Sequence, residues 1–294
     1  MNVLLCGLGA IGAIYADKLS KSGDIDFCVL VDQNRKNLYA QNPTFLNGCK
    51  LNLRYILSSE DFSADVIIIA TKNNDLLDVL DSVKGFVNDN TIFLSLLNGI
   101  TSEKIIADRY GQEKVLLSYY IGHSAERDGR NIFHDGVNTI VFGSKSNNDN
   151  VLKIKKLFER VNINYEIPND IEHSLWFKFM VNVALNQTTA LYKITVGEML
   201  ENEDAYQFFN NLINEVEKVA IAENINNSHS LRDEVCAFVN SMPYDSKTSM
   251  LQDVLANRKT EISTFAGTMV ELGKKYKIDV PYNNLVLQKL INYF

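Results

Sequence analysis

Short apolar runs alternate with helical patterns through the first half of the chain. Runs rich in Val, Ile, Leu and Phe occur at 3–6, 27–31, 65–70, 91–97 and 115–121. Apolar residues with the three-to-four spacing of a helix occur at 10–22, 74–83 and 151–161. Strands and helices that alternate in this way predict a parallel sheet covered by helices.

One segment of the first half has a different pattern. Two β-rich runs within 129–143 lie on either side of Asp135 and Gly136. Because Asp-Gly is a frequent two-residue turn between antiparallel strands, this segment predicts a β-hairpin with its turn at these two residues.

The pattern changes after Pro168, where strand signals nearly vanish. Helical spacing covers 175–191, 206–223, 231–241, 249–276 and 283–293. Asn169 or Asp170 can cap the first of these helices. The sequence therefore predicts an α/β chain of two domains. Residues 1–167 are expected to form a doubly wound sheet covered by helices, and residues 168–294 an all-α domain.

Composition and charge exclude several classes of protein. The chain has 294 residues, 46% of them hydrophobic, and a formal net charge of −7. An acidic chain is a poor partner for nucleic acid or an anionic membrane surface. No apolar run approaches the roughly 20 residues that span a bilayer, and Met1-Asn2 lacks the basic start of a secretory signal. We therefore expect a cytoplasmic protein with neither a membrane nor a nucleic-acid partner.

The residues that commonly bind metal ions are scattered. Neither the four cysteines nor the four histidines form a cluster with metal-ligand spacing. The sequence therefore predicts no metal site.

A glycine-rich loop follows the first predicted strand and opens the first predicted helix. It consists of Gly7, Leu8, Gly9, Ala10, Ile11 and Gly12. In the pattern Gly-x-Gly-x-x-Gly the first glycine permits a tight turn, the second lets the backbone approach a pyrophosphate, and the third allows close packing of helix and strand. The N-terminus of the helix offers free N–H groups to the phosphates. This loop predicts dinucleotide binding.

The end of the second predicted strand bears on the choice of dinucleotide. Asp32 lies about 20 residues beyond Gly12, where an acidic residue accepts the ribose 2′-OH of NAD and repels the 2′-phosphate of NADP. Arg35 and Lys36 follow closely and could instead bind a 2′-phosphate. The choice between NAD and NADP therefore stays open at this point.

Two further polar positions follow predicted strands. Lys72 comes after the third strand, and Asn98-Gly99 comes after the fourth. The carboxyl ends of parallel strands form the edge at which such sheets bind ligands. The same positions also fit a solvated lysine and an ordinary Asn-Gly turn.

A polar stripe runs along the nearly all-apolar helix at 175–186. Lys178, Asn182 and Asn186 recur at every fourth position and therefore share one face of this helix. An all-round apolar helix is buried, and buried polar groups need partners. The stripe either is a narrow solvated face or lines a cleft for a polar ligand, in which Lys178 could act as a proton donor.

A second stripe of the same spacing lies further along the chain. It consists of Ser249, Asp253, Asn257 and Glu261 within the helix predicted at 249–276. Polar residues at this spacing more often form a solvent-exposed face.

The chain resembles the ketopantoate reductase (2-dehydropantoate 2-reductase) family over nearly its whole length. In the first half the resemblance rests on GLGAIG at 7–12, TK at 71–72, LNG at 97–99 and ERDG at 126–129. In the second half it rests on LWFKFMVNVALN at 175–186, SMLQD at 249–253, TEI at 260–262 and VP at 280–281.

The resemblance implies an N-terminal Rossmann domain and a helical C-terminal domain. The apolar C-terminal helices fit either a monomer or a homodimer. The implied reaction is the NADPH-dependent reduction of the 2-keto acid 2-dehydropantoate to (R)-pantoate, a step toward pantothenate and coenzyme A. NADP is thus the cofactor implied by the family, while Asp32 keeps NAD open.

The resemblance also implies roles for individual residues. The family's catalytic lysine and glutamate match Lys178 and Glu261. Lys72 matches a position near the adenosine phosphate of the cofactor, and Asn98 a position beside the nicotinamide. The family's substrate-binding positions match Asn98, Lys178, Asn182, Asn186, Ser249 and Glu261.

The chain departs from the family pattern at two positions of the substrate pocket. Val196 and Ser246 stand where the family often has asparagine. A reductase of another small 2-keto acid is therefore an alternative function. An alternative of a different class is a non-catalytic NAD(P)-binding regulator, although Lys178 and Glu261 are both present.

Overall fold

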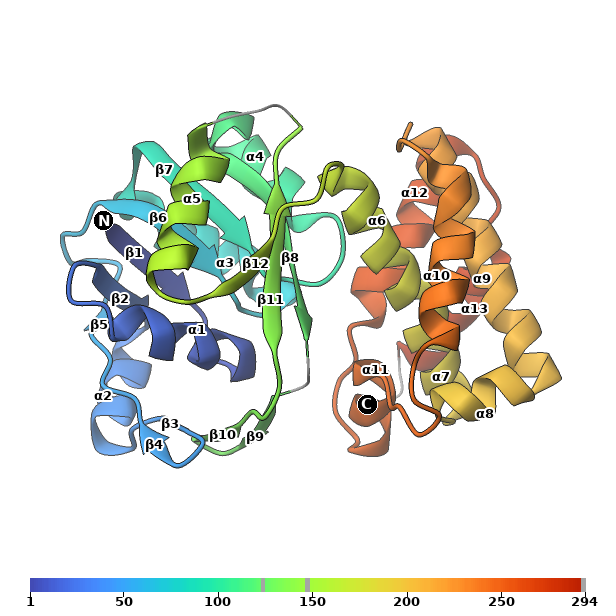
Figure 1. The fold of residues 1–294 in the computed structure, drawn as a ribbon, viewed down its shortest axis with the longest axis horizontal. Coiled ribbons are helices and arrows are strands. Elements are labelled where there is room, and N and C mark those ends of the chain that lie inside the picture. Colours follow the sequence, from blue (N-terminus) through green and yellow to red (C-terminus); the bar gives the residue numbers. More distant parts are fainter. Residues whose placement is uncertain (123–124, 146–148, 292–294) are drawn as a thin grey trace. The chain divides into compact units, whose positions relative to one another are not determined.

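The computed structural model describes residues 1–122, 125–145 and 149–291. Residue contacts divide the chain into two compact units, Met1–Ile171 and Glu172–Phe294, and each is described by itself. Figure 1 shows the elements of both units.

The first unit contains an eight-stranded sheet. Its strands are β1 (Asn2–Cys6), β2 (Asp26–Leu30), β5 (Tyr55–Ile56), β6 (Ala64–Ile69), β7 (Val87–Ser95), β8 (Val115–Gly122), β11 (Asn138–Gly143) and β12 (Asn164–Glu166). Their order across the sheet is β12-β11-β8-β7-β6-β1-β2-β5. All neighbouring strands are parallel except β11 and β8, which are antiparallel. The chain thus passes from β1 to β2 on one side and later fills the other side, which is the doubly wound arrangement that the sequence predicts.

Helices cover both faces of this sheet because its central strands are apolar on both sides. The helices of the first unit are α1 (Ala10–Ser20), α2 (Gln33–Gln41), α3 (Leu76–Ser82), α4 (Ser102–Tyr110) and α5 (Asp149–Arg160). In β1, Val3 and Leu5 belong to the core beneath α1 and α5, whereas Leu4 and Cys6 belong to the core beneath α3 and α4. Successive side chains of a strand point to opposite faces, so β1 contributes to both cores.

The hairpin predicted around Asp135 and Gly136 is wrong. A second sheet holds β3 (Phe45–Leu46), β4 (Cys49–Lys50), β9 (Glu126–Asp128) and β10 (Asn131–Phe133). β10 pairs with β9, and Gly129 lies in the turn between them with a φ of +58°. The following run, β11, pairs with β8 instead. β11 is nearly all buried, and packing in the larger sheet covers its apolar side chains as a hairpin with β10 could not.

Helices joined by loops make up the described part of the second unit, residues 172–291, which contains no strand. Its helices are α6 (Ile171–Val181, which begins at the boundary), α7 (Gln187–Tyr192), α8 (Val196–Glu201), α9 (Glu203–Ala222), α10 (Leu231–Asn240), α11 (Ser249–Leu255), α12 (Thr268–Tyr276) and α13 (Pro281–Leu290). Two wider π-helical turns occur at Asn182–Asn186 and Ser263–Gly267, and the two contact each other. Turns of this kind occur frequently at functional sites.

The single helix predicted at 249–276 is also wrong, because it is broken after Leu255. Asn257 adopts the left-handed conformation, with φ +51°. Its N–H donates to the Val254 carbonyl, and the Arg258 N–H donates to the Asp253 carbonyl. These two hydrogen bonds form the Schellman motif that ends a helix. The polar stripe from Ser249 to Glu261 therefore does not lie on one continuous helix.

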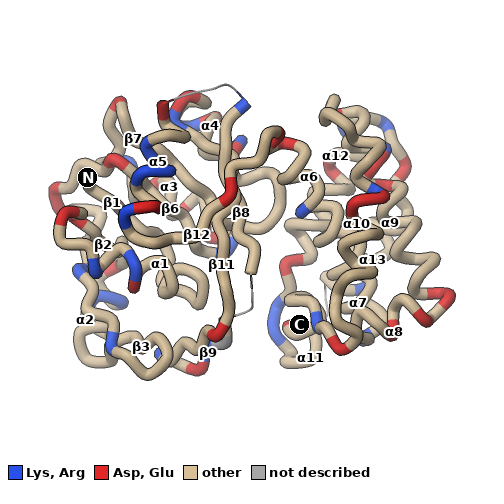
Figure 2. Tube along the Cα trace, in the orientation of Figure 1, with Lys and Arg blue, Asp and Glu red and all other residues tan. Residues whose placement is uncertain are grey.

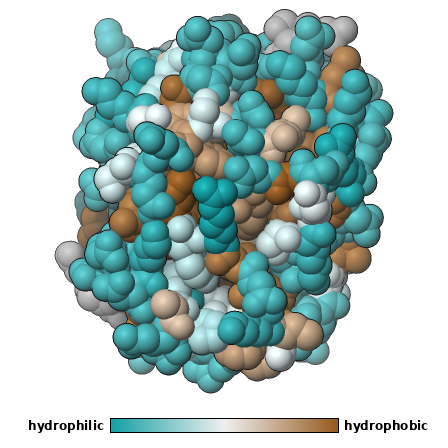
Figure 3. Space-filling model, turned by 90° about the vertical axis from the view of Figure 1, so that its left-hand side faces the viewer, coloured by the Kyte–Doolittle hydropathy of each residue, from teal (hydrophilic) through white to brown (hydrophobic). Residues whose placement is uncertain are grey.

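The surface carries charges of both signs. Figure 2 shows basic and acidic residues interspersed along the trace of each unit, and the face in Figure 3 is largely hydrophilic with smaller apolar areas between polar side chains. Within the described ranges, no helix combines the length and the apolar composition that crossing a membrane requires.

Candidate functional site

The predicted cofactor residues gather at one edge of the large sheet. Four adjacent strands, β7, β6, β1 and β2, run parallel. Gly7 follows β1, Asp32 follows β2, Lys72 follows β6 and Asn98 follows β7. The strand order reverses at β1, and such a reversal opens a crevice at the carboxyl ends of the strands.

The glycines of the loop have distinct physical roles. Gly7 has a φ of +102°, and a Cβ there would lie 2.6 Å from the carbonyl oxygen of Ala70. A Cβ at Gly12 would overlap the Gly7 carbonyl oxygen, whereas a Cβ at Gly9 would meet no atom within 4 Å. The packing of the chain itself thus requires glycine at positions 7 and 12. At position 9 the absence of a side chain leaves open space beside the backbone.

That open space lies at the N-terminus of α1. Gly9 is the N-cap residue, and no side chain caps the helix there. Leu8 is buried, and Ala10 and Ile11 are partly buried in the first turn. The N-terminus of a helix binds anions through its free N–H groups, so the loop fits the pyrophosphate of a dinucleotide.

A cavity of about 310 Å³ adjoins the loop. Its lining residues are Cys6, Gly7, Leu30, Val31, Asp32, Arg35, Ser58, Thr71, Asp75, Asp78, Val79 and Ser82. Asp32 caps α2 by accepting the Arg35 N–H at 2.7 Å, and its carboxylate lies 3.5 Å from the Arg35 guanidinium. The hydroxyl of Thr71 is buried and has no hydrogen-bond partner within the described structure. The cavity therefore has the size and the polar groups of a site for part of a cofactor.

The charges that line this cavity are mainly negative. Asp32, Asp75 and Asp78 contribute carboxylates, and Arg35 contributes the one guanidinium in the lining. Lys72 is exposed and does not line the cavity. Asp75 and Asp78 were not among the predicted site residues. Asp75 is the N-cap residue of α3 and Asp78 lies in its first turn, and a spacing of three places such residues on one face of a helix.

In the second unit, Lys178 lies one helical turn before Asn182. Lys178 belongs to the last turn of α6 and is partly buried. Burial lowers the pKa of this lysine from its usual value, because desolvation disfavours the ammonium form. A lysine with a lowered pKa is better matched to proton transfer near neutral pH.

Two predicted substrate residues of this helix meet a third from another helix. Asn182 and Asn186 are 3% and 6% exposed. The Asn186 Nδ2 donates to the Asn182 Oδ1 and to the Ser249 Oγ, both at 3.3 Å. The Asn182 Nδ2 is buried and has no hydrogen-bond partner within the described structure. Because an unpaired buried amide is costly, this group is a candidate to bind a polar ligand.

Glu261 lies next to the second π-helical turn. It is partly buried, and its carbonyl accepts the Thr264 N–H at 2.9 Å. The two π-helical turns contact each other, so residues adjacent to both turns belong to one region of the second unit.

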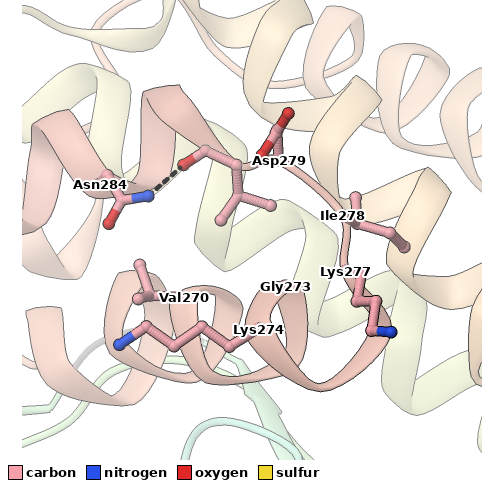
Figure 4. A pocket seen from close by; sticks show the side chains of 8 residues that line it. Val270, Gly273, Lys274, Lys277, Ile278, Asp279 and Asn284 are labelled. Atoms are coloured by element: carbon pink, nitrogen blue, oxygen red, sulfur yellow. Dashed lines mark hydrogen bonds between the residues drawn. The ribbon is translucent and has the colours of Figure 1, made fainter.

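Another cavity, of about 290 Å³, lies between the end of α12 and the start of α13. Figure 4 shows Lys274 and Lys277 on one side of it and Asn284, whose amide donates to the Val280 carbonyl, on the other. None of the site residues predicted from the sequence lines it. Nor do any three His, Cys, Asp or Glu side chains of the described residues form a group that could hold a metal ion.

Comparison with known families covers both units. Residues 3–147 match the family described as "Ketopantoate reductase PanE/ApbA", and residues 170–293 match its C-terminal domain. The chain belongs to the ketopantoate reductase family. Its sheet and helices are the Rossmann-type fold and the helical domain expected for this family, and the protein is an NAD(P)-dependent oxidoreductase.

Relatives within the ketopantoate reductase family carry different names. The chain is 28% identical to a 2-dehydropantoate 2-reductase of Aquifex aeolicus (strain VF5), over 97% of this chain and 94% of that one. It is 26% identical to the uncharacterized oxidoreductase YkpB of Bacillus subtilis (strain 168), over 100% and 99%. A solved structure of D-mandelate dehydrogenase with NADH and anilino(oxo)acetate has a similar fold, with a TM-score of 0.85 at 23% identity over 100% of this chain and 98% of that one.

Val196 and Ser246, the two positions expected to depart from the family pattern, are joined by a backbone hydrogen bond. The Val196 N–H donates to the Ser246 carbonyl at 3.0 Å, and Val196 is fully buried. Ser246 precedes Thr248, the N-cap residue of α11, whose first residue is Ser249. These two positions thus adjoin the segment that carries Ser249, the hydrogen-bond partner of Asn186.

Proposed function

We propose that the protein reduces a small 2-keto acid, with 2-dehydropantoate, which gives (R)-pantoate, as the first candidate. The observation that carries this proposal is the arrangement of polar side chains along α6 and the π-helical turn that follows it. Lys178, with its lowered pKa, lies one turn before Asn182, whose buried Nδ2 has no hydrogen-bond partner within the described residues. Asn186 and Ser249 complete the polar group.

In this proposal the first unit binds the dinucleotide and the second unit binds the keto acid. A bound nicotinamide dinucleotide supplies the hydride. Lys178 holds a proton on Nζ, stabilises the negative charge that develops on the carbonyl oxygen, and donates the proton to it. Asn98, Asn182 and Asn186 orient the reactants, and Ser249 binds the carboxylate. Glu261 orients Lys178 or accepts a hydrogen bond from a substrate hydroxyl.

A second candidate is a reductase of a different small 2-keto acid. The adjacent Val196 and Ser246 favour it, because a buried valine offers no side-chain hydrogen bond where an asparagine could hold a polar group. A site without that donor discriminates less in favour of a hydroxylated substrate.

Steady-state turnover separates the two candidates. We expect oxidation of the reduced dinucleotide with 2-keto acids, and the measurement compares kcat/KM for 2-dehydropantoate with kcat/KM for analogues that lack its hydroxyl. A higher kcat/KM for the analogues assigns the second candidate. Dinucleotide binding without turnover of any 2-keto acid contradicts both candidates and favours a regulator.

We propose further that the protein prefers NADH to NADPH. The support is the charge of the cavity beside Gly7, where Asp32, Asp75 and Asp78 outnumber Arg35. The carboxylate after the second strand of such folds accepts the ribose hydroxyls, and it repels a 2′-phosphate. The Arg35 guanidinium is already paired with Asp32 at 3.5 Å.

The preference is expected to depend on Asp32. Hydrogen bonds to charged groups contribute about 1.5–3 kcal/mol, so Asp32→Asn should reduce the ratio of NADPH Kd to NADH Kd by roughly 10-fold to 100-fold. Fluorescence titration of both dinucleotides gives these constants without turnover. Asp61→Asn, at an exposed position outside the cavity, is the matched control. Tighter binding of NADPH by the unmodified protein contradicts the preference.

A further inference from the structure

The first π-helical turn departs from a regular helix at Gln187. In an α-helix the Gln187 N–H would donate to the Val183 carbonyl, four residues earlier. Here it donates to the Ala184 carbonyl instead. The Gln187 side chain takes its place, and its Nε2 donates to the Val183 carbonyl at 2.6 Å. The side chain thus donates to a carbonyl that does not receive its usual α-helical hydrogen bond from the Gln187 N–H.

The Gln187 amide is itself held by a buried network. Its Nε2 also donates to the Asn283 Oδ1 at 3.1 Å, and the Asn283 Nδ2 donates to a Glu215 carboxylate oxygen at 2.7 Å. Glu215 further accepts the backbone N–H groups of Tyr282 and Asn283 at the start of α13. Gln187 and Asn283 are fully buried, and Glu215 is 4% exposed.

Such a network is costly to bury and is not the simplest way to pack three helices. The Gln187 Oε1 remains without a hydrogen-bond partner within the described structure, and apolar side chains of similar volume would avoid that penalty. The network connects α9 and α13 to the turn that begins with Asn182 and ends with Asn186. Its position therefore indicates a role in setting the geometry of that turn.

We propose that Gln187 is a positioning residue, which holds the π-helical turn so that Asn182 and Asn186 present their amides together toward the substrate. This inference rests on the proposed reduction of a 2-keto acid. With the turn in place, the Asn186 Nδ2 reaches both the Asn182 Oδ1 and the Ser249 Oγ. A return of residues 182–186 to regular α-helical spacing rotates the two asparagines relative to each other by changing the residues per turn.

The test replaces Gln187 by Met, which has a similar length and no amide. A misplacement of about 1 Å at reacting groups can cost roughly 100-fold in rate, so kcat/KM for the keto acid should fall 10-fold to 100-fold. The dinucleotide Kd should not change, because the dinucleotide is assigned to the first unit. Asn283→Ala, which frees the Gln187 amide without removing it, should give a smaller fall in the same direction.

A matched control separates positioning from stability. Val239 is fully buried in α10 of the same unit, and Val239→Ala destabilises the unit without removing a hydrogen bond. All variants are compared below their melting temperatures. An equal fall in kcat/KM for Val239→Ala, or an unchanged kcat/KM for both Gln187→Met and Asn283→Ala, overturns the inference.

A crystal structure of Gln187→Met tests the inference independently of activity. We expect residues 182–186 to adopt regular α-helical hydrogen bonds in the variant. If the unmodified protein reduces no 2-keto acid, the proposed function is contradicted. If Gln187→Met keeps the π-helical turn, the positioning role is contradicted. The two failures are therefore distinguishable.

Discussion

Replacement of Lys178 by alanine is expected to lower kcat for keto-acid reduction by about 10²–10⁴-fold, the usual contribution of general acid catalysis. The physical reason is the loss of the ammonium group that stabilises and protonates the developing alkoxide. Lys178 lies on a largely apolar helix, so alanine keeps the helical backbone. Stopped-flow or steady-state oxidation of the reduced dinucleotide measures the loss.

The pH profile gives a second measurement of the same role. Reduction needs the ammonium form, so its kcat should fall as the pH rises through the Lys178 pKa. Burial lowers that pKa from the usual 10.5, which brings the fall to a lower pH than for an exposed lysine. Lys178→Ala should lack this limb of the profile. Lys289→Ala, at an exposed position of α13, is the control. A folded Lys178→Ala protein with unchanged kcat removes this lysine from the chemistry.

The glycine loop gives the second large expected effect. Replacement of Gly9 by alanine should weaken dinucleotide binding, whereas replacement of Gly12 should lower stability. A Cβ at Gly9 meets no protein atom within 4 Å, so Gly9→Ala should fold normally. The added methyl group occupies the space at the N-terminus of α1 that the pyrophosphate needs. We expect the dinucleotide Kd to rise by roughly 10-fold to 100-fold, which corresponds to about 1.4–2.8 kcal/mol.

Gly12→Ala should instead destabilise the protein. A Cβ there overlaps the Gly7 carbonyl oxygen, and overpacking of this kind costs about 1–3 kcal/mol. Each kcal/mol lowers the melting temperature by roughly 2–4 °C in a chain of this size class. Calorimetry and dinucleotide titration on both variants separate the two effects. Gly23→Ala, where a Cβ also meets no atom within 4 Å, is the control. A destabilised Gly9→Ala protein with unchanged dinucleotide affinity contradicts the assignment.

The sequence predicted the fold class because local periodicity records which side of an element is buried. The runs at 3–6, 27–31 and 65–70 became β1, β2 and β6 within a residue or two at each end. The helix at 249–276 failed because the left-handed conformation of Asn257 is a backbone choice that the apolar periodicity does not reveal. The hairpin prediction was wrong because the apolar pattern indicates where strands occur but not which strands pair.

Some residues of the candidate site could likewise be predicted from local sequence patterns, and others could not. The glycine loop and the stripe of Lys178, Asn182 and Asn186 are local patterns, so the sequence revealed them directly. Asp75 and Asp78 join Asp32 around one cavity only because β6 and β2 lie on either side of β1.

By itself, then, the sequence determined the alternation of strands and helices in the first half, the helical character of the second half, the loop at the N-terminus of α1 and the polar face of the helix that carries Lys178. Only the tertiary structure decided that Asn186 meets Ser249, that Val196 meets Ser246, and that Gln187 reaches Glu215 through Asn283. The reason is that a periodic pattern fixes the buried face of one element. Contacts between segments distant in the chain depend on how all the elements pack together.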